Sequence, residues 1–220
     1  MDVKSNLAVI QQDINASLGR SPYHHQVEVI AVTKYVSIER AQEATQAGIT
    51  HLGENRIEGF NEKREHIQGV TMHFIGSLQT RKVKEVINQI DYLHSLDRMS
   101  LAKEIQKRAD KKVKCFIQVN VSGEESKHGI AASEVQTFTQ NLAEYDNIEV
   151  VGLMTMAPLE ASEEEIRHYF KQLKKLQLEI NQLALPHAPC TELSMGMSND
   201  YKIAIEEGAT FIRIGTKLVG

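Results

Sequence analysis

Short apolar runs alternate with longer amphipathic segments along the whole chain. Several of the short runs are rich in β-branched residues and apolar at consecutive positions, as expected of strands in a parallel sheet covered on both faces. The segments between them repeat apolar residues at steps of three or four, the period of a helix with one buried face. Eight strands are predicted in this way, at residues 27–34, 50–54, 72–76, 92–96, 114–121, 148–156, 190–196 and 210–216.

The helix predicted over residues 162–183 has the clearest pattern in the chain. Its apolar residues form one stripe, which indicates a single buried face. Ser162 and Glu165 form a capping box, so the acidic cluster there is interpreted as a helix start and not as a metal site. Ser133 and Gln136 give the same signal. Other helices are predicted over residues 2–19 and 133–143, and Ala47-Gly48 and Glu207-Gly208 are predicted helix ends.

Repeated strand–helix units predict a parallel sheet with right-handed crossovers. Eight such units fit a single-domain (β/α)8 TIM barrel, a fold that begins at about 200 residues. We therefore predict one barrel over residues 1–220, with an N-terminal helix before the first strand. Because the chain ends at Gly220, we expect no helix after the eighth strand and expect the N-terminal helix to take that place. An open doubly wound sheet is the alternative, weakened by the absence of a GxGxxG fingerprint.

Composition narrows the class of protein. The chain is 41% hydrophobic and 25% charged, with a net charge of −4 and no Trp, unlike the basic surface of a nucleic-acid-binding protein. No signal peptide and no run of about 18 apolar residues occurs, so we expect a cytoplasmic protein without a membrane span. Cys115 and Cys190 lie in apolar runs and are predicted to be buried free thiols. No strong exposed apolar stripe is evident, so we expect a monomer.

Lys34 stands out among the residues at the carboxyl ends of the predicted strands, where barrels of this kind place their function. It ends the apolar run VIAVT, where an ammonium group is costly unless it reaches water or a partner. A lysine condenses with an aldehyde only when neutral, and at pH 7 this costs a free lysine about 4.6 kcal/mol. Burial near another cation removes part of that cost. A lysine whose stem is buried and whose head reaches water is the alternative interpretation.

Two clusters of small and hydroxyl residues follow the seventh and eighth strands, where barrels often bind phosphate. Small residues let backbone N–H groups approach phosphate oxygens, although turn formation explains the same residues. Arg213 alternates with Ile212 and Ile214, so we expect it to point into the barrel, toward a cofactor ring nitrogen or a buried carboxylate. The candidate phosphate ligands are Ser194, Gly196, Ser198, Gly215 and Thr216.

The nine histidines show no metal-ligand spacing. His51, His73 and His94 fall singly on three successive predicted strands, and no HxH or HExxH motif occurs. We interpret the histidines as structural or exposed residues and predict no metal site.

Taken together, these residues resemble the pyridoxal phosphate homeostasis protein family, also called the proline synthase co-transcribed homologue family. The matching segments extend over almost the whole chain and are highly specific in combination. The resemblance implies a barrel similar to the N-terminal domain of alanine racemase. The segments are AVTKY (31–35), HLGENR (51–56), HFIGSLQTRK (73–82), SLDR (95–98), QVNVSGEESKHG (118–129), GLMTMAP (152–158), ELSMGMSNDY (192–201) and RIGT (213–216).

The resemblance also implies a ligand and a role. It implies binding of pyridoxal 5'-phosphate (PLP), with other B6 vitamers as further ligands, and a Schiff base on Lys34. It implies a carrier or buffer of the cofactor that has no catalytic turnover. The cofactor-binding residues that it implies are Lys34, Asn55, Ser194, Ser198, Arg213, Gly215 and Thr216.

Two other functions remain open at this point. A PLP-dependent racemase-type enzyme needs a base on each face of its substrate, and Lys34 supplies only one. Tyr35 and Tyr201 lie near site residues in the sequence without further evidence for that role, and no residues remain for the C-terminal β-domain of a racemase. A Schiff-base aldolase would use Lys34 without a cofactor and hold a sugar phosphate in the loops. Lys82 and Lys127 are the alternative attachment sites.

Overall fold

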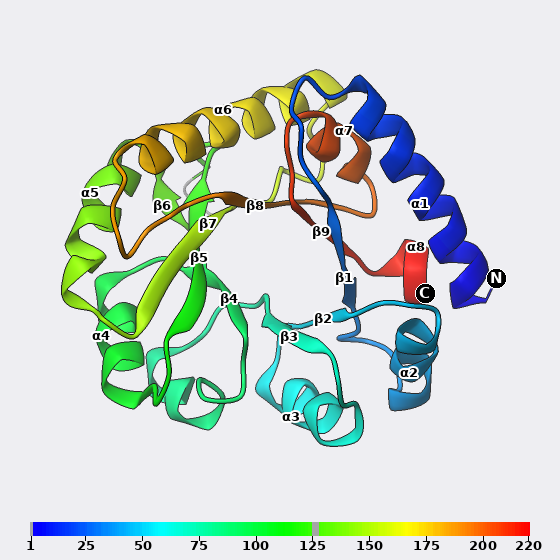
Figure 1. Ribbon diagram of the computed structural model, residues 1–220, viewed down its shortest axis with the longest axis horizontal. Coiled ribbons are helices and arrows are strands. Elements are labelled where there is room, and N and C mark those ends of the chain that lie inside the picture. The colour runs from blue at the N-terminus through cyan, green and yellow to red at the C-terminus, as the bar shows by residue number, and fades with distance from the viewer. Residues whose placement is uncertain (1, 125–127) are drawn as a thin grey trace.

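Eight parallel strands close into a barrel in the computed structural model, which describes residues 2–124 and 128–220 (Figure 1). Each strand coincides with a predicted one to within a few residues, so the predicted fold class is confirmed. The strands are β1 (Glu28–Val32), β2 (His51–Glu54), β3 (Thr71–Phe74), β4 (Tyr92–Leu96), β5 (Val113–Asn120), β7 (Ile148–Met154), β8 (Glu192–Met197) and β9 (Phe211–Ile214).

Strand pairing completes a ring. β1 pairs with β2 on one side and with β9 on the other, and pairing continues around both sides of the sheet. β4 pairs with β5, so each strand of the ring has two neighbours and no edge is left unpaired. The open-sheet alternative is therefore excluded. The short strand β6 (Ile130–Ala131) pairs with β5 outside the ring.

Helices surround the barrel. They are α1 (Val3–Arg20), α2 (Ile38–Gln46), α3 (Ile57–His66), α4 (Met99–Arg108), α5 (Val135–Asn141), α6 (Glu163–Gln182), α7 (Tyr201–Glu206) and α8 (Thr216–Val219), with 3-10 helices η1 (Thr80–Glu85), η2 (Ala132–Glu134) and η3 (Leu142–Glu144). In the described part of the chain, none of them is long and apolar enough to cross a membrane.

The N-terminal helix α1 packs against α7, α8 and α2, so it takes the outer position predicted for it (Figure 1). The expectation that no helix follows the last strand is wrong, because β9 ends at Ile214 and the chain turns into α8. A helix of one turn is too short to show a periodic pattern, and the prediction absorbed its first residue, Thr216, into the strand.

The predicted helix ends are mostly confirmed. The Ser162 hydroxyl accepts from the backbone N–H of Glu165, whose carboxylate accepts from the N–H of Ser162. Gly48 and Gly208 follow α2 and α7 with φ of +110° and +98°. The capping box predicted at Ser133 is wrong. Ser133 lies inside η2, so it is already in a helical turn and lacks the extended conformation of an N-cap residue.

The apolar core has two layers. The larger layer packs the outward face of the strands against the helices, and Cys115 and Cys190 are buried free thiols there, as predicted. The smaller layer fills the inside of the barrel. Its residues come from four strands and are Ile30, Phe116, Val151, Met154 and Phe211. Strand alternation places one face of each strand in this interior, and the site lies above it at the carboxyl ends.

Candidate functional site

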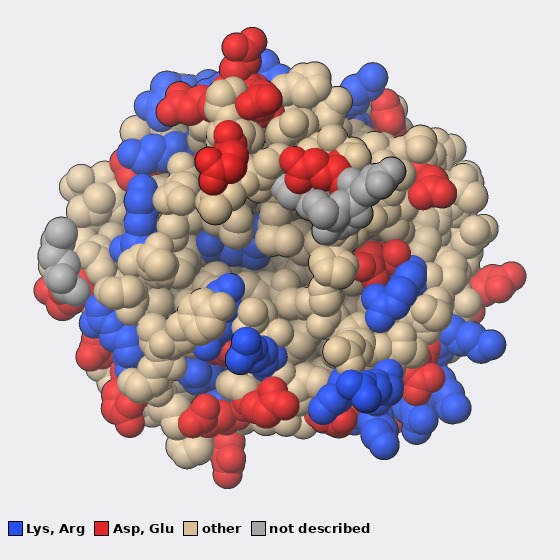
Figure 2. Space-filling view, turned by 180° about the vertical axis from the view of Figure 1, so that it is seen from behind, with Lys and Arg blue, Asp and Glu red and all other residues tan. Residues whose placement is uncertain are grey.

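A cavity of about 650 Å³ opens at the carboxyl ends of the barrel strands. Figure 2 shows this face hollowed near its centre, with basic side chains around the hollow. All but Ser194 of the predicted cofactor-binding residues line the cavity, so residues from distant parts of the sequence meet at one place. Those that line it are Lys34, Asn55, Ser198, Arg213, Gly215 and Thr216.

Lys34 lies in the turn that follows β1, two residues beyond the end of the strand. Its side chain is exposed to the cavity, with Nζ 4.8 Å from the centre of the Tyr35 ring. The residue before it, Thr33, is fully buried and donates from its hydroxyl to Glu54 at 2.6 Å. The Lys34 amine therefore stands on a fixed backbone but faces open space.

Glu54 fixes the ends of β1 and β2 relative to each other. Its carboxylate is buried and also lies 3.5 Å from Nζ of Lys63, on α3, which is itself buried. Burial raises the pKa of Glu54, while the hydrogen bond from Thr33 and the charge of Lys63 oppose that rise. The buried contact between Thr33 and Glu54 therefore holds the backbone before Lys34 next to the strand end that carries Asn55.

Asn55 lines the cavity and carries a buried polar atom that is unpaired within the described part of the chain. Its Oδ1 is buried, and no hydrogen-bond partner for it exists among the residues that the structure describes. A buried polar atom without a partner costs about 1–3 kcal/mol, so a ligand that pairs with it would be stabilised. The unpaired oxygen is compatible with a polar ligand such as PLP.

Ser198, Gly215 and Thr216 lie together on the side of the cavity formed by the ends of β8 and β9. The loop after β8 is held by Asp200, whose carboxylate accepts from the backbone N–H of Met197 at 2.5 Å. Burial raises the pKa of Asp200, and that hydrogen bond opposes the rise. Backbone N–H groups and hydroxyls without bulky neighbours suit the oxygens of a phosphate.

Arg213 points into the barrel, as its alternation with Ile212 and Ile214 predicts. It is 4% exposed and donates to the Ser194 hydroxyl oxygen at 2.5 Å and to the carbonyl oxygen of Thr155 at 3.0 Å. Burial lowers its pKa to about 10, while the charge of Asp200 opposes the fall. The guanidinium therefore keeps its charge at neutral pH and forms part of the cavity wall.

Ser194 lies behind Arg213 and is fully buried. Its hydroxyl oxygen accepts from Arg213 and lies 2.8 Å from Nδ1 of His94. Its assignment as a phosphate ligand stays a prediction. His94 in turn lies next to His73, and His73 next to His51. The interpretation of these histidines as separate structural residues missed this contact, because their positions depend on how the strands are aligned.

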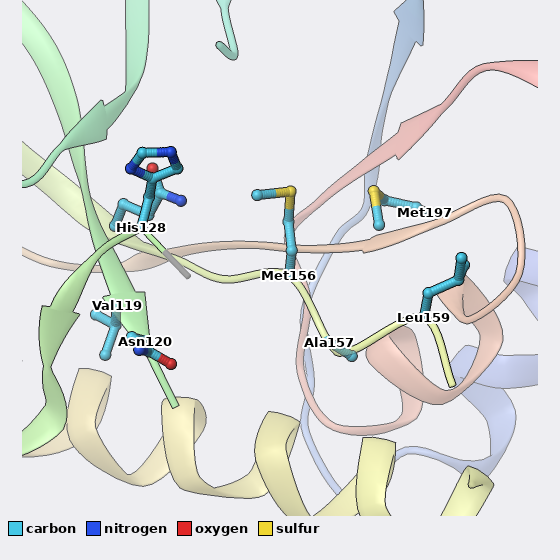
Figure 3. A pocket seen from close by; sticks show the side chains of 8 residues that line it. Val119, Asn120, His128, Met156, Ala157, Leu159 and Met197 are labelled. Carbon is cyan, nitrogen blue, oxygen red and sulfur yellow. The ribbon is translucent and has the colours of Figure 1, made fainter. Parts of the chain in front are cut away.

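A smaller cavity of about 300 Å³ adjoins the main one. Met156, Leu159 and Met197 give it an apolar wall, and His128 and Gln118 add polar groups (Figure 3). Several of its residues also line the main cavity, so the two cavities share a wall.

Of the two alternative lysines, Lys82 is described by the structure and is less suited to the site. Lys82 lies in η1, where Nζ is 3.3 Å from a Glu85 carboxylate oxygen, and it does not line the cavity described above. Lys127 lies outside the described residues. Tyr201 donates its hydroxyl to Asp13 on α1, so it is engaged away from the cavity, whereas Tyr35 lines it.

Comparison with known proteins defines the class first. The alanine racemase N-terminal domain family model matches residues 5–220, so the fold is that of a barrel of that family. The chain is 42% identical over 201 residues to the pyridoxal phosphate homeostasis protein of Aquifex aeolicus. The matched region covers 88% of this chain and 86% of that protein. The chain belongs to the pyridoxal phosphate homeostasis protein family.

Solved structures agree with this assignment. PipY of Synechococcus elongatus, solved with PLP bound, matches 99% of this chain and 100% of its own at 30% identity, with a TM-score of 0.86. An alanine racemase of Clostridium difficile matches 99% of this chain and 56% of its own at 14% identity, with a TM-score of 0.77. The second likeness is one of fold alone.

Proposed function

We propose that this protein binds PLP in the cavity at the carboxyl ends of the barrel and serves as a carrier or buffer in PLP homeostasis, without catalytic turnover. The observation that carries the proposal is that Lys34, Asn55 and Arg213 converge on one cavity, in a family named for this role. The PLP-bound structure of PipY supports the choice of ligand.

The residues at the cavity match the parts of the ligand. Of the residues that line the cavity, Lys34 would hold the aldehyde, Ser198, Gly215 and Thr216 would bind the phosphate, and Arg213 would contact the ring. When bound, the cofactor supplies an aldehyde that condenses with an amine and releases water. A guanidinium has only donors to offer, so Arg213 suits a ring nitrogen without a proton. Such a ring is a weaker electron sink, which favours storage of the cofactor over carbanion chemistry.

A racemase-type enzyme is the competing proposal. It needs a second base opposite Lys34, and Tyr35 is the tyrosine at the cavity that would have to supply it. A racemase assay with each proteinogenic amino acid separates the two. Turnover that is lost in Tyr35→Phe would favour the enzyme.

Two finer features complete the proposal. Other B6 vitamers share the ring and are expected to bind more weakly when they lack the phosphate. The buried free thiols of Cys115 and Cys190 suit a reducing compartment, so we propose that the protein acts in the cytoplasm. We also propose that it is a monomer, because the sequence has no strong exposed apolar stripe.

The test is the absorption spectrum of the purified protein before and after borohydride, followed by peptide mass mapping. We expect a yellow protein that is bleached by borohydride and carries a phosphopyridoxyl group on Lys34. Lys34→Ala should lose the covalent adduct and retain weaker binding through the phosphate, whereas Lys82→Ala should behave as wild type. A colourless protein that takes up no added PLP would contradict the proposal and favour a lysine aldolase for sugar phosphates.

A further inference from the structure

Three inward-facing histidines cross the interior of the barrel and meet Arg213. Nδ1 of His51 lies 2.8 Å from Nε2 of His73, and Nδ1 of His73 lies 2.8 Å from Nε2 of His94. Nδ1 of His94 lies 2.8 Å from Oγ of Ser194, the oxygen that accepts from Arg213. We call His51, His73, His94 and Ser194 the histidine row.

The tilt of the strands brings the row together. His51 is paired with Thr71 across β2 and β3, and His73 lies two residues nearer the carboxyl end. His73 is paired with Tyr92 across β3 and β4, and His94 again lies two residues farther along. Because every second residue of a strand faces the same side, each step keeps the side chain inside the barrel and raises it toward the cavity.

Arg213 at one end of the row and Glu28 at the other favour one direction for its hydrogen bonds. A guanidinium only donates and a carboxylate only accepts. Arg213 donates to Oγ of Ser194, which leaves the hydroxyl hydrogen for Nδ1 of His94. At the other end, a carboxylate oxygen of Glu28 lies 3.7 Å from Nε2 of His51. Both ends therefore favour the hydrogen on Nε2 of every imidazole.

The opposite direction conflicts with both ends. Ser194 would accept from both Arg213 and His94, and within the described residues its own hydrogen would have no acceptor. Nε2 of His51 would turn a lone pair toward the Glu28 carboxylate. Buried groups left without a partner are unfavourable, so this arrangement is the less stable one.

The surroundings of the row keep the imidazoles neutral. His73 and His94 are fully buried, and the Tyr92 and Phe116 rings stack on them with centres 4.6 and 4.4 Å apart. Burial lowers the pKa of both well below the ordinary value, and for His94 the charges of His73 and Arg213 add to the effect. A neutral imidazole carries one N–H and one acceptor nitrogen, so a row of three has a single direction at a time.

We propose that the histidine row positions Arg213, with each imidazole held in the tautomer that carries its hydrogen on Nε2. Ser194, His94, His73 and His51 are positioning residues, which fix the guanidinium at the floor of the cavity from behind. The role of Arg213 toward a ligand ring rests on the proposed function, whereas the direction of the row does not.

The first test uses the wild-type protein without ligand. Long-range 1H–15N spectra of histidine-labelled protein distinguish the two neutral tautomers and the imidazolium. We expect His51, His73 and His94 each to carry a hydrogen on Nε2 and none on Nδ1 at pH 8. A hydrogen on Nδ1 of His73 or His94 would overturn the proposal, whether or not the protein binds PLP.

The second test measures the effect on Arg213 through added PLP. His94→Phe removes both hydrogen bonds and keeps a ring in the core, whereas His94→Gln keeps one donor and one acceptor. We expect His94→Phe to bind PLP about tenfold more weakly, because Ser194 loses the hydrogen bond that orients it toward Arg213, and to shift the visible absorption maximum. His94→Gln should restore much of both.

His187 offers a matched control, since its Nε2 lies 2.8 Å from the carbonyl oxygen of Thr139, outside the row. His187→Phe should leave affinity and spectrum unchanged. A folded His94→Phe that equals wild type in both would contradict the positioning role. If His94→Phe does not fold by circular dichroism, Ser194→Ala replaces it with the same two outcomes. Failure of wild type to bind PLP would refute the proposed function and leave the tautomer test standing.

Discussion

Gly76 shows how a single residue governs the approach of two strand ends below the cavity. A Cβ atom at this position would lie 2.3 Å from the carbonyl oxygen of Asn55 and 2.8 Å from its Cα. Both atoms belong to the backbone, so they cannot swing aside as a flexible side chain would. The close contact sets the position of Asn55, which lines the cavity.

Gly76→Ala should therefore weaken both the fold and the site. Overpacking against backbone costs about 1–3 kcal/mol, so we expect the free energy of unfolding to fall by that amount in urea titrations. PLP should also bind more weakly, because Asn55 must move. Gly19→Ala is the control, since Gly19 lies in α1 with open space around its Cβ position. It should stabilise the protein by about 0.5–1 kcal/mol. Equal unfolding midpoints for Gly76→Ala and wild type would refute the argument.

At the scale of elements, the sequence predicted the repeated strands and longer helices and missed helices of a single turn. The strands were predicted because their apolar runs are covered on both faces. The outer position of α1 was predicted from the expectation that no helix follows the last strand; the position is right although α8 follows that strand. The helix α8 and the 3-10 helix η2 were missed because a single turn has no period to detect. Ser133 is a residue type that often caps helices, but it does not have the conformation of a cap. That conformation depends on the path of the chain after β6, which the sequence pattern does not show.

Two serines with the same sequence signal therefore make a matched test of capping. Ser162 begins α6 with both hydrogen bonds of a capping box, whereas Ser133 lies within η2 and caps nothing. Ser162→Ala should lower the free energy of unfolding by about 1 kcal/mol, the usual cost of a lost N-cap. Ser133→Ala should change it by less than about 0.5 kcal/mol, as a surface substitution does. Equal losses in the two variants would mean that Ser162 does not act as a cap.

At the scale of the whole molecule, closing the barrel creates an interior that sequence reasoning could only partly foresee. Lys34 and Arg213 were predicted because strand ends of a barrel meet at one face, whatever the alignment of the strands, and Asn55 was implied by the family resemblance. The histidine row depends on that alignment. His51, His73 and His94 come together only because each strand is displaced along its neighbour, which no pattern within one strand records.

Burial of this row should make the stability of the whole barrel depend on pH. The pKa of His73 and His94 is well below 6.5 in the folded protein, because burial disfavours the imidazolium. In the unfolded chain both titrate near the ordinary pKa of about 6.5. Above that pH neither state binds the protons and the full stability is present. As the pH falls below it, the unfolded chain binds protons that the folded barrel does not, so the free energy of unfolding falls.

Urea titrations between about pH 7.5 and 5.5 measure this slope, which should approach about 1.4 kcal/mol per pH unit for each of the two histidines. Burial also lowers the pKa of His25 and His51, which adds to the effect in the same direction. His73→Gln removes one titrating group and should reduce the slope by about 1.4 kcal/mol per pH unit. His168→Gln, exposed on α6, should leave it unchanged. A free energy of unfolding that stays constant over this range would mean that the interior imidazoles accept protons in the folded state, and a single neutral row could not then hold Arg213 in place.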